Sequence, residues 1–140
     1  MEKVLVSACL LGVNCKYNGN SNKNEKVLKY IKDKQVIPIC PEILGGLSTP
    51  RTPSEVSNNR IITKDGKDVT SNYTKGAEEV LKLCKLFDVK KAILKSKSPS
   101  CGSGLIYDGT FSNILTKGDG ITTKLLKENN IEVLTEDDLW

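Results

Sequence analysis

The sequence predicts one α/β domain built on a mainly parallel sheet with small hairpin insertions. Two observations support this prediction: short β-branched apolar runs alternate along the chain with segments of helical apolar spacing, and no repeat or linker divides them. Such alternation is typical of βαβ units, in which a crossover helix joins parallel strands. With 38% hydrophobic residues the chain can build a core. Its 140 residues suit one domain, at about 100–200 residues per domain, so we expect a single domain over residues 1–140.

Four short runs are expected to form the strands of the sheet. Each is rich in β-branched apolar residues, as in strands that are buried on both faces. The runs are Lys3–Ala8, Gln35–Ile39, Lys91–Lys95 and Ile131–Leu134.

Three segments with apolar residues at helical intervals are expected to form helices. They are Glu25–Lys34, Ser71–Phe87 and Gly120–Asn129. In the longest segment, Thr70 is expected to cap the helix. The apolar face of that helix should carry Ala77, Val80, Leu81, Cys84 and Phe87.

Turn-forming residues fill most of the remaining chain. The segment Pro41–Asn59 is rich in Pro, Gly, Ser and Thr, and we expect little regular structure there. A loop of that length in a compact domain usually has a function. Asp-Gly pairs within Arg60–Val69 and Tyr107–Thr110 predict two small hairpins.

Composition excludes several classes of function. The chain has no histidine, which excludes Ser-His-Asp triads, Cys–His dyads and Cys/His zinc sites. The net charge of +4 comes mainly from lysine, with Arg51 and Arg60 as the only arginines, and aromatic content is 5%. Because a nucleic-acid groove favours clustered Arg and interleaved aromatics, direct nucleic-acid binding is not expected.

No segment resembles an export signal or a membrane span. The apolar stretch Val4–Ala8 is shorter than the about 7–15 residues of a signal peptide's apolar region. No apolar run approaches the about 20 residues that cross a bilayer. We therefore expect a cytoplasmic protein without a membrane partner.

The five cysteines suggest where chemistry takes place. Cys9 follows the first expected strand, Cys40 follows the second, and Cys101 lies a few residues after the third. Because ligands bind at the carboxyl ends of parallel strands, these three thiols could share one crevice. The alternative is that each packs as a small buried apolar residue, which is the expected role of Cys84. Cys15 lies in a polar loop, where it could be a fourth ligand, a resolving thiol or a residue without a role.

Thiolates without histidine suit two kinds of metal centre. A structural zinc site needs four ligands, and Cys15 could supply the fourth. An iron–sulfur cluster usually takes four cysteines as well. With only three, one iron would be open and could act as a Lewis acid. The spacing alone does not choose between these centres.

An ordered set of motifs resembles the thiouracil desulfidase family. The resemblance runs from Val4 to about Leu126. Its motifs are Val6-Ser7-Ala8-Cys9-Leu10-Leu11-Gly12 with Tyr17-Asn18-Gly19, Cys40-Pro41-Glu42 with Leu44-Gly45-Gly46-Leu47 and Pro50-Arg51, Asp65-Gly66-Lys67-Asp68-Val69-Thr70, and Ser98-Pro99-Ser100-Cys101-Gly102 with Tyr107-Asp108-Gly109-Thr110-Phe111.

The resemblance implies a compact, Rossmann-like, three-layer fold and a 4Fe-4S cluster with one open iron. The three cluster ligands correspond to Cys9, Cys40 and Cys101. The substrate would be a thiolated base or nucleoside such as 2-thiouracil. Its sulfur would pass to the open iron, water would replace it, and uracil and sulfide would leave.

The same resemblance assigns further residues to the site. Glu42 and Ser98 correspond to the acid/base residues. Apart from the resemblance, we expect Ser100 to bind the substrate and Arg51 to orient the substrate or a bound anion. Because the chain lacks histidine, a carboxylate is the natural proton carrier. For Arg51, a surface salt bridge is the alternative.

The chain departs from the family pattern at one motif, where Lys16-Tyr17-Asn18-Gly19 replaces the usual Arg-Tyr-Asp-Gly. Two other hypotheses remain beside the desulfidase. One is a non-catalytic zinc-binding module that uses Cys9, Cys15, Cys40 and Cys101. The other is a metal-free sulfurtransferase that carries a persulfide on Cys101.

Overall fold

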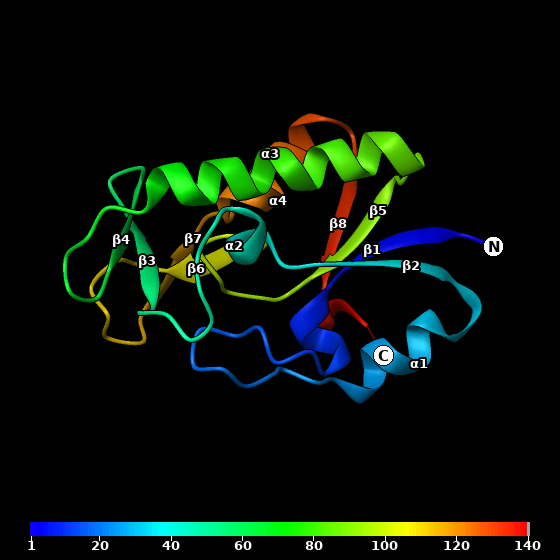
Figure 1. Cartoon of the computed structure of the whole chain (residues 1–140), viewed down its shortest axis with the longest axis horizontal. Helices are drawn as coiled ribbons and strands as arrows, with labels where there is room; N and C mark the ends of the chain where they lie inside the picture. The colour runs from blue at the N-terminus through cyan, green and yellow to red at the C-terminus, as the bar shows by residue number, and fades with distance from the viewer. Residues whose placement is uncertain (140) are drawn as a thin grey trace.

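The computed structural model describes residues 1–139 and contains a four-stranded parallel sheet (Figure 1). In spatial order the strands are β2 (Gln35–Ile39), β1 (Lys3–Ser7), β5 (Lys91–Leu94) and β8 (Glu132–Thr135). Strand β1 pairs with β2 along its whole length and with β5 on its other side. The predicted parallel α/β fold is confirmed, and its four strands match the four expected runs to within one residue at each end.

Helices cover both faces of the sheet. Helices α3 (Thr70–Phe87) and α4 (Ile121–Glu128) pack on one face. Helix α1 (Glu25–Tyr30) and the 3-10 turns η1 (Ala8–Leu11) and η2 (Ile31–Asp33) lie on the other (Figure 1). The result is the predicted three-layer arrangement. In the described chain, residues 1–139, no helix has the length and apolar character to cross a bilayer.

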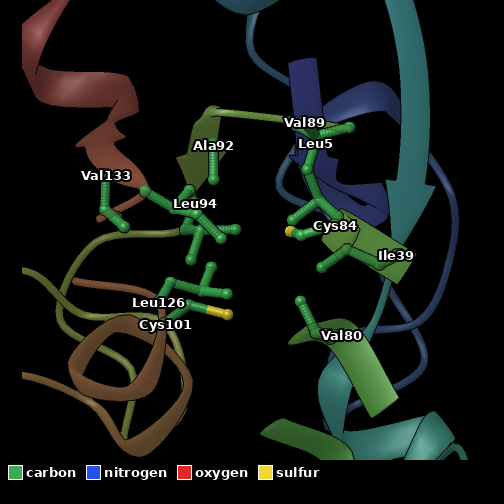
Figure 2. Close-up of a cluster of buried hydrophobic side chains, with 11 residues drawn as sticks. Leu5, Ile39, Val80, Cys84, Val89, Ala92, Leu94, Cys101, Leu126 and Val133 are labelled. Atoms are coloured by element: carbon green, nitrogen blue, oxygen red, sulfur yellow. The ribbon is translucent and has the colours of Figure 1, made fainter. Parts of the chain in front are cut away.

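The core follows the two-residue period of the strands, since successive side chains point to opposite faces. Leu5 of β1 packs with Val80 and Leu126, which come from α3 and α4. The neighbouring residues Val4 and Val6 join the cluster under α1 instead. Figure 2 shows the first cluster, with Cys84 on α3 as expected for a core residue.

Two antiparallel hairpins lie at the sheet end where β1 and β2 finish (Figure 1). The first joins β3 (Ser54–Ser57) to β4 (Arg60–Thr63) through Asn58 and Asn59, both at positive φ. The expectation of little regular structure in Pro41–Asn59 is therefore wrong, because asparagine tolerates the positive φ values that a tight turn needs. The predicted Asp65-Gly66 turn forms, but only one bridge, between Ile62 and Asp68, pairs across it.

The second hairpin joins β6 (Leu105–Tyr107) to β7 (Leu115–Lys117). It confirms the second predicted hairpin, with a longer loop than the Asp-Gly pair alone implies. Glu55 of β3 holds this loop, because its Oε1 accepts hydrogen bonds from the backbone N–H groups of Gly109 (3.0 Å) and Phe111 (3.1 Å).

The structure differs from three expectations near the ends of α1 and α3. Thr70 does not cap α3 but is its first residue, and its N–H donates to Asp68 Oδ1 at 2.9 Å. Phe87, expected in the core, is the last residue of α3, directly before the C-cap residue Asp88, and is 45% exposed. Helix α1 ends at Tyr30 and continues only as the short η2 turn.

Sequence analysis missed a short helix, α2 (Pro41–Leu44). It packs so closely on α3 that the backbones of the two segments are in contact. Pro41 is its first residue, a position where proline has no donor to lose. A Cβ on Gly76 of α3 would clash with the carbonyl oxygen of Pro41, and a Cβ on Gly45 would clash with that of Asn72. Two glycines thus let α2 lie directly on α3.

A buried ion pair ties the end of β5 to the C-terminal 3-10 turn η3 (Glu136–Asp138). Lys95 Nζ lies 2.8 Å from Glu136 Oε2, and the Glu136 side chain is 9% exposed. The N–H and the hydroxyl of Ser96 also donate to this carboxylate. Burial alone raises the pKa of Glu136, but the hydrogen bonds from Lys95 and Ser96 outweigh it and lower the pKa below the usual value.

We predict that Gly76→Ala destabilises the protein although Ala is the better helix former. The substitution would normally stabilise a helix by about 0.5–1 kcal/mol. Here the added methyl must displace the Pro41 carbonyl, so we expect a net loss of about 1–3 kcal/mol in the free energy of unfolding. Urea titration measures the difference. Lys75→Ala, at the neighbouring exposed position, is the control and should change little. A Gly76→Ala variant as stable as the parent would contradict the close contact.

We predict that Glu136→Gln destabilises the protein at neutral pH and that this difference shrinks in acid. Because the folded-state pKa of Glu136 is lowered, its stabilising effect is present above the unfolded-state pKa and is lost as pH falls through the folded-state pKa. Urea unfolding from neutral pH down to about pH 3 measures both effects. Asp137→Asn, an exposed neighbour, is the control. A difference independent of pH would show that the ion pair is not its source.

Candidate active site

A cavity of about 550 Å³ opens at the carboxyl end of β1, β2 and β5. Its walls come from the segments that follow these strands and from both hairpins. Cys9, Cys15, Cys40 and Cys101 all line it. The structure therefore brings together the three strand-end cysteines, adds Cys15 to them, and leaves Cys84 in the core.

Cys9 and Cys40 present half-buried thiols to the cavity. Cys9 lies in η1, and its Sγ accepts a hydrogen bond from Asn22 Nδ2 at 3.5 Å. Cys40 directly precedes α2, and its thiol contacts Glu42 Oε2 at 3.7 Å. A hydrogen bond with the Cys15 thiol is the main cause that lowers the pKa of both, to about 7 for Cys9. Thiolates are the form that binds metal, so these two sulfurs are suited to ligation.

Cys15 is buried between these two residues, with 3% of its surface exposed. The interaction of its thiol with the sulfurs of Cys40 and Cys9 raises the pKa of Cys15. The pKa of Cys15 is thus shifted in the opposite direction from the pKa values of these two neighbours. In residues 1–139, no three Cys, Asp or Glu side chains converge closely enough to hold a single metal ion.

Cys101 lies in the loop that follows β5 and is the most deeply buried of the three strand-end cysteines. Ser7 Oγ, at the end of β1, lies 3.7 Å from its Sγ. Burial is the main cause that raises the pKa of Cys101. Figure 2 shows its side chain beside Leu126, at the point where the core meets the cavity.

Ser98 organises the loop that carries Cys101. Its Oγ accepts hydrogen bonds from the backbone N–H groups of Ser100 (3.2 Å) and Cys101 (2.6 Å). Ser98 also lines the cavity. Both contacts use its hydroxyl as an acceptor, so the O–H can still donate to a group in the cavity.

Ser100 lies behind the cavity wall and not in it. It is fully buried, and its Oγ is 2.8 Å from Thr122 Oγ1 on α4. Its carbonyl accepts a hydrogen bond from the N–H of Thr122. The geometry therefore gives no support to direct contact between Ser100 and a substrate.

Glu42 and Arg51 form a buried ion pair on the cavity wall. Arg51 Nη2 lies 3.2 Å from Glu42 Oε2 and donates to the Cys15 carbonyl at 3.0 Å. The side chains are 9% exposed for Arg51 and 15% for Glu42, so the pair is not a surface salt bridge. Burial raises the pKa of Glu42, and the positive charge of Arg51 opposes that shift.

The second oxygen of the Glu42 carboxylate has no protein partner. Glu42 Oε1 is buried and makes no hydrogen bond of ordinary geometry within residues 1–139, although the Ser100 hydroxyl lies close enough to the carboxylate to lower the pKa of Glu42. Buried polar atoms are nearly always hydrogen-bonded, so an exception on a cavity wall indicates a group that meets a ligand or water there.

Sequence analysis missed several side chains of the cavity. Lys95, the last residue of the third predicted strand, lines the wall with the Glu136 ion pair behind it. Its place at a strand end was the available signal. Tyr17, Tyr107 and Phe111 add aromatic surface, and the last two come from the second hairpin and its loop.

The donor set of this cavity suits an iron–sulfur cluster. Three strand-end thiols face one space, no histidine competes, and two of the thiols, Cys9 and Cys40, have lowered pKa values. Iron–sulfur clusters are held by such thiolates. A cluster is also larger than one ion, so its ligands stand farther apart than those of a single metal. Cys9, Cys40 and Cys101 could therefore hold one.

Comparisons with known proteins agree with this geometry. A family model described as 2-thiouracil desulfurase matches residues 4–138. The uncharacterised protein YbbK of Bacillus subtilis (strain 168) is 42% identical in an alignment that covers 97% of each chain. The solved structure of the 4Fe-4S-dependent thiouracil desulfidase TudS matches with a TM-score of 0.92 at 42% identity, covering 99% of this chain and 93% of that one. The chain therefore belongs to the 2-thiouracil desulfurase family.

Proposed function

We propose that this protein is a single-domain desulfidase that removes sulfur from thiolated nucleobases or nucleosides such as 2-thiouracil and releases uracil and sulfide. One observation carries the proposal: three strand-end thiols share a cavity with a buried carboxylate that has an unpartnered oxygen. The family to which the chain belongs supports it. So does the printed name of the structural relative, a 4Fe-4S-dependent thiouracil desulfidase.

Cys9, Cys40 and Cys101 are the residues that would hold a 4Fe-4S cluster in this protein. Bound by three thiolates, the cluster would supply an iron without a protein ligand, a soft Lewis acid suited to the sulfur of a substrate. Asn22 and Ser7 would support two of the ligands, since their polar side chains contact the sulfurs of Cys9 and Cys101. Such hydrogen bonds orient and tune metal ligands.

Glu42 is the residue that we assign to proton transfer. Replacing the substrate's sulfur by oxygen needs a proton to leave the incoming water and a proton to reach the departing sulfur or the ring. The carboxylate lies two residues beyond Cys40, and its unpartnered Oε1 can accept a proton from a water molecule.

Arg51 is assigned a positioning role and not the predicted contact with substrate. Its guanidinium hydrogen-bonds Glu42, the Cys15 carbonyl and the Ser48 carbonyl (3.3 Å). These bonds fix the carboxylate against the cavity wall. Burial raises the pKa of Glu42, and the positive charge of Arg51 opposes this rise, so Arg51 supports the ionised form that acts as a base.

Ser98 is assigned to the orientation of water or substrate through its O–H. Its acceptor contacts with the loop backbone hold the oxygen in place, so the hydroxyl is preorganised. Ser100 locks the same loop onto α4 through Thr122. Its effect on the substrate would be indirect.

We predict that the protein, purified without air, contains about four irons and four acid-labile sulfides per chain. The visible spectrum should show broad absorption. Cys101→Ala should lose this iron because it removes a ligand, whereas Cys84→Ala, in the core, should retain it. About one zinc per chain without colour would instead indicate the zinc-binding module and would overturn the desulfidase proposal.

We predict that Glu42→Gln keeps its iron and loses turnover. The amide has nearly the shape of the carboxylate but cannot accept the proton, so release of uracil from 2-thiouracil should fall by about 10²-fold or more. Chromatography of uracil and colorimetry of sulfide measure the rate. Glu128→Gln removes the same charge from an exposed site on α4 and should leave the rate unchanged. Normal turnover in Glu42→Gln would remove Glu42 from the mechanism.

A further inference from the structure

The proposed reaction assigns no role to the Cys15 thiol, which lines the cavity. Cys15 is buried, lies on the cavity wall, and is not one of the three ligands assigned above. It differs from Cys84, the other cysteine outside the ligand set, which packs in the apolar core. A thiol beside two ligand thiols needs its own explanation.

A close contact places Cys15 against Cys40. Cys40 Sγ lies 3.9 Å from the Cys15 carbonyl oxygen, and both residues line the same cavity. The hydrogen bond of the Cys9 sulfur is made with Asn22 instead. Of the two neighbours, Cys40 is therefore held more closely to Cys15.

The backbone of Cys15 is fixed on both sides. Its N–H donates to the Val13 carbonyl at 2.8 Å, and its own carbonyl accepts from Arg51 Nη2 at 3.0 Å. The N–H of Arg51 in turn donates to the Tyr17 carbonyl at 2.7 Å. The loop thus carries Cys15 as a rigid partner for Cys40, and not as a thiol on a free chain.

We propose that Cys15 is a resolving cysteine, which forms a reversible disulfide with Cys40 when the cluster is absent and a small soluble disulfide is present. Cys40 is the half-buried residue of the pair and faces the cavity, so its sulfur reacts first with the soluble disulfide. Cys15 is shielded and completes the exchange. The consequence for cluster loading rests on the proposed function, but formation of the bridge does not.

The exchange balances with oxidised glutathione as the oxidant. The Cys40 thiolate attacks one sulfur of glutathione disulfide, that S–S bond breaks, and one glutathione thiolate leaves. Cys15 then loses its proton and attacks the Cys40 sulfur of the mixed disulfide, and the second glutathione leaves. Two protein thiols lose two electrons and two protons, and one glutathione disulfide becomes two glutathione thiols.

The bridge would have two effects on the site. The Cys40 sulfur cannot bind iron while it is bonded to Cys15, so the oxidised protein needs a reductant before it can load a cluster. A disulfide also shields Cys40 from oxidation to sulfinic and sulfonic acids, which are irreversible for most proteins.

The test uses the full-length protein, freed of iron with a chelator and treated with oxidised glutathione. Mass spectrometry should find the loss of two hydrogens, and peptide mapping should place the new bond between Cys15 and Cys40. Dithiothreitol should restore the original mass. In Cys15→Ser, and in Cys15→Ala as a second variant, a glutathione adduct should remain on Cys40. Cys84→Ser is the matched control and should form the bridge as the parent does.

Three results would overturn the proposal: a bridge between Cys9 and Cys40, no bridge at all, or the same loss of mass in both Cys15 variants. Iron uptake separates this inference from the proposed function. The oxidised parent should take up iron and sulfide only after reduction. If the bridge forms but the reduced protein takes up no iron, the resolving role of Cys15 stands and the cluster assignment fails.

Discussion

The parallel register of β1 with its two neighbours is the constraint on which the site depends. Strand β1 runs beside β2 and β5 in the same direction, so all three strands finish at one edge of the sheet. Residues that are 31 and 61 positions apart in the chain, Cys9 to Cys40 and Cys40 to Cys101, therefore line one cavity. An antiparallel partner for β1 would send one of these thiols to the opposite edge. The sheet positions the thiols, and the helices and hairpins enclose them.

Electrostatics then divides these similar groups into different roles. Interaction with the Cys15 thiol lowers the pKa of Cys9 and Cys40, the same interactions with Cys40 and Cys9 raise the pKa of Cys15, and burial raises the pKa of Cys101. Glu42 lies between two opposing influences, burial and the charge of Arg51. A chain without histidine thus obtains groups of different acidity from thiols and the Glu42 carboxylate. Their surroundings, and not their residue types, set the differences.

Sequence reasoning found what depends on local pattern and missed what depends on long-range contact. The strands and the shared edge for Cys9, Cys40 and Cys101 follow from apolar runs and the rule for parallel sheets. Helix α2 and strand β3 were missed because Pro, Gly, Ser and Thr mask short elements that tertiary packing stabilises. No pattern in the sequence shows that Arg51 meets Glu42 across nine positions, since a loop of irregular backbone brings them together. The position of Ser100 behind the wall depends likewise on α4, more than twenty residues further along the chain.

The contact between α2 and α3 has a consequence for how this protein can vary. A side chain at Gly76 would meet the carbonyl of Pro41, and one at Gly45 would meet the carbonyl of Asn72. Carbonyl groups belong to every residue, so no second substitution can make room by shrinking the opposing partner. In many cores, a larger side chain at one position is compensated by a smaller one opposite it. Gly45 and Gly76 have no such compensation, because the opposing atoms are backbone. Helix α2, which carries Glu42, can therefore accept substitutions on its exposed face. It cannot accept a larger residue where its backbone contacts α3.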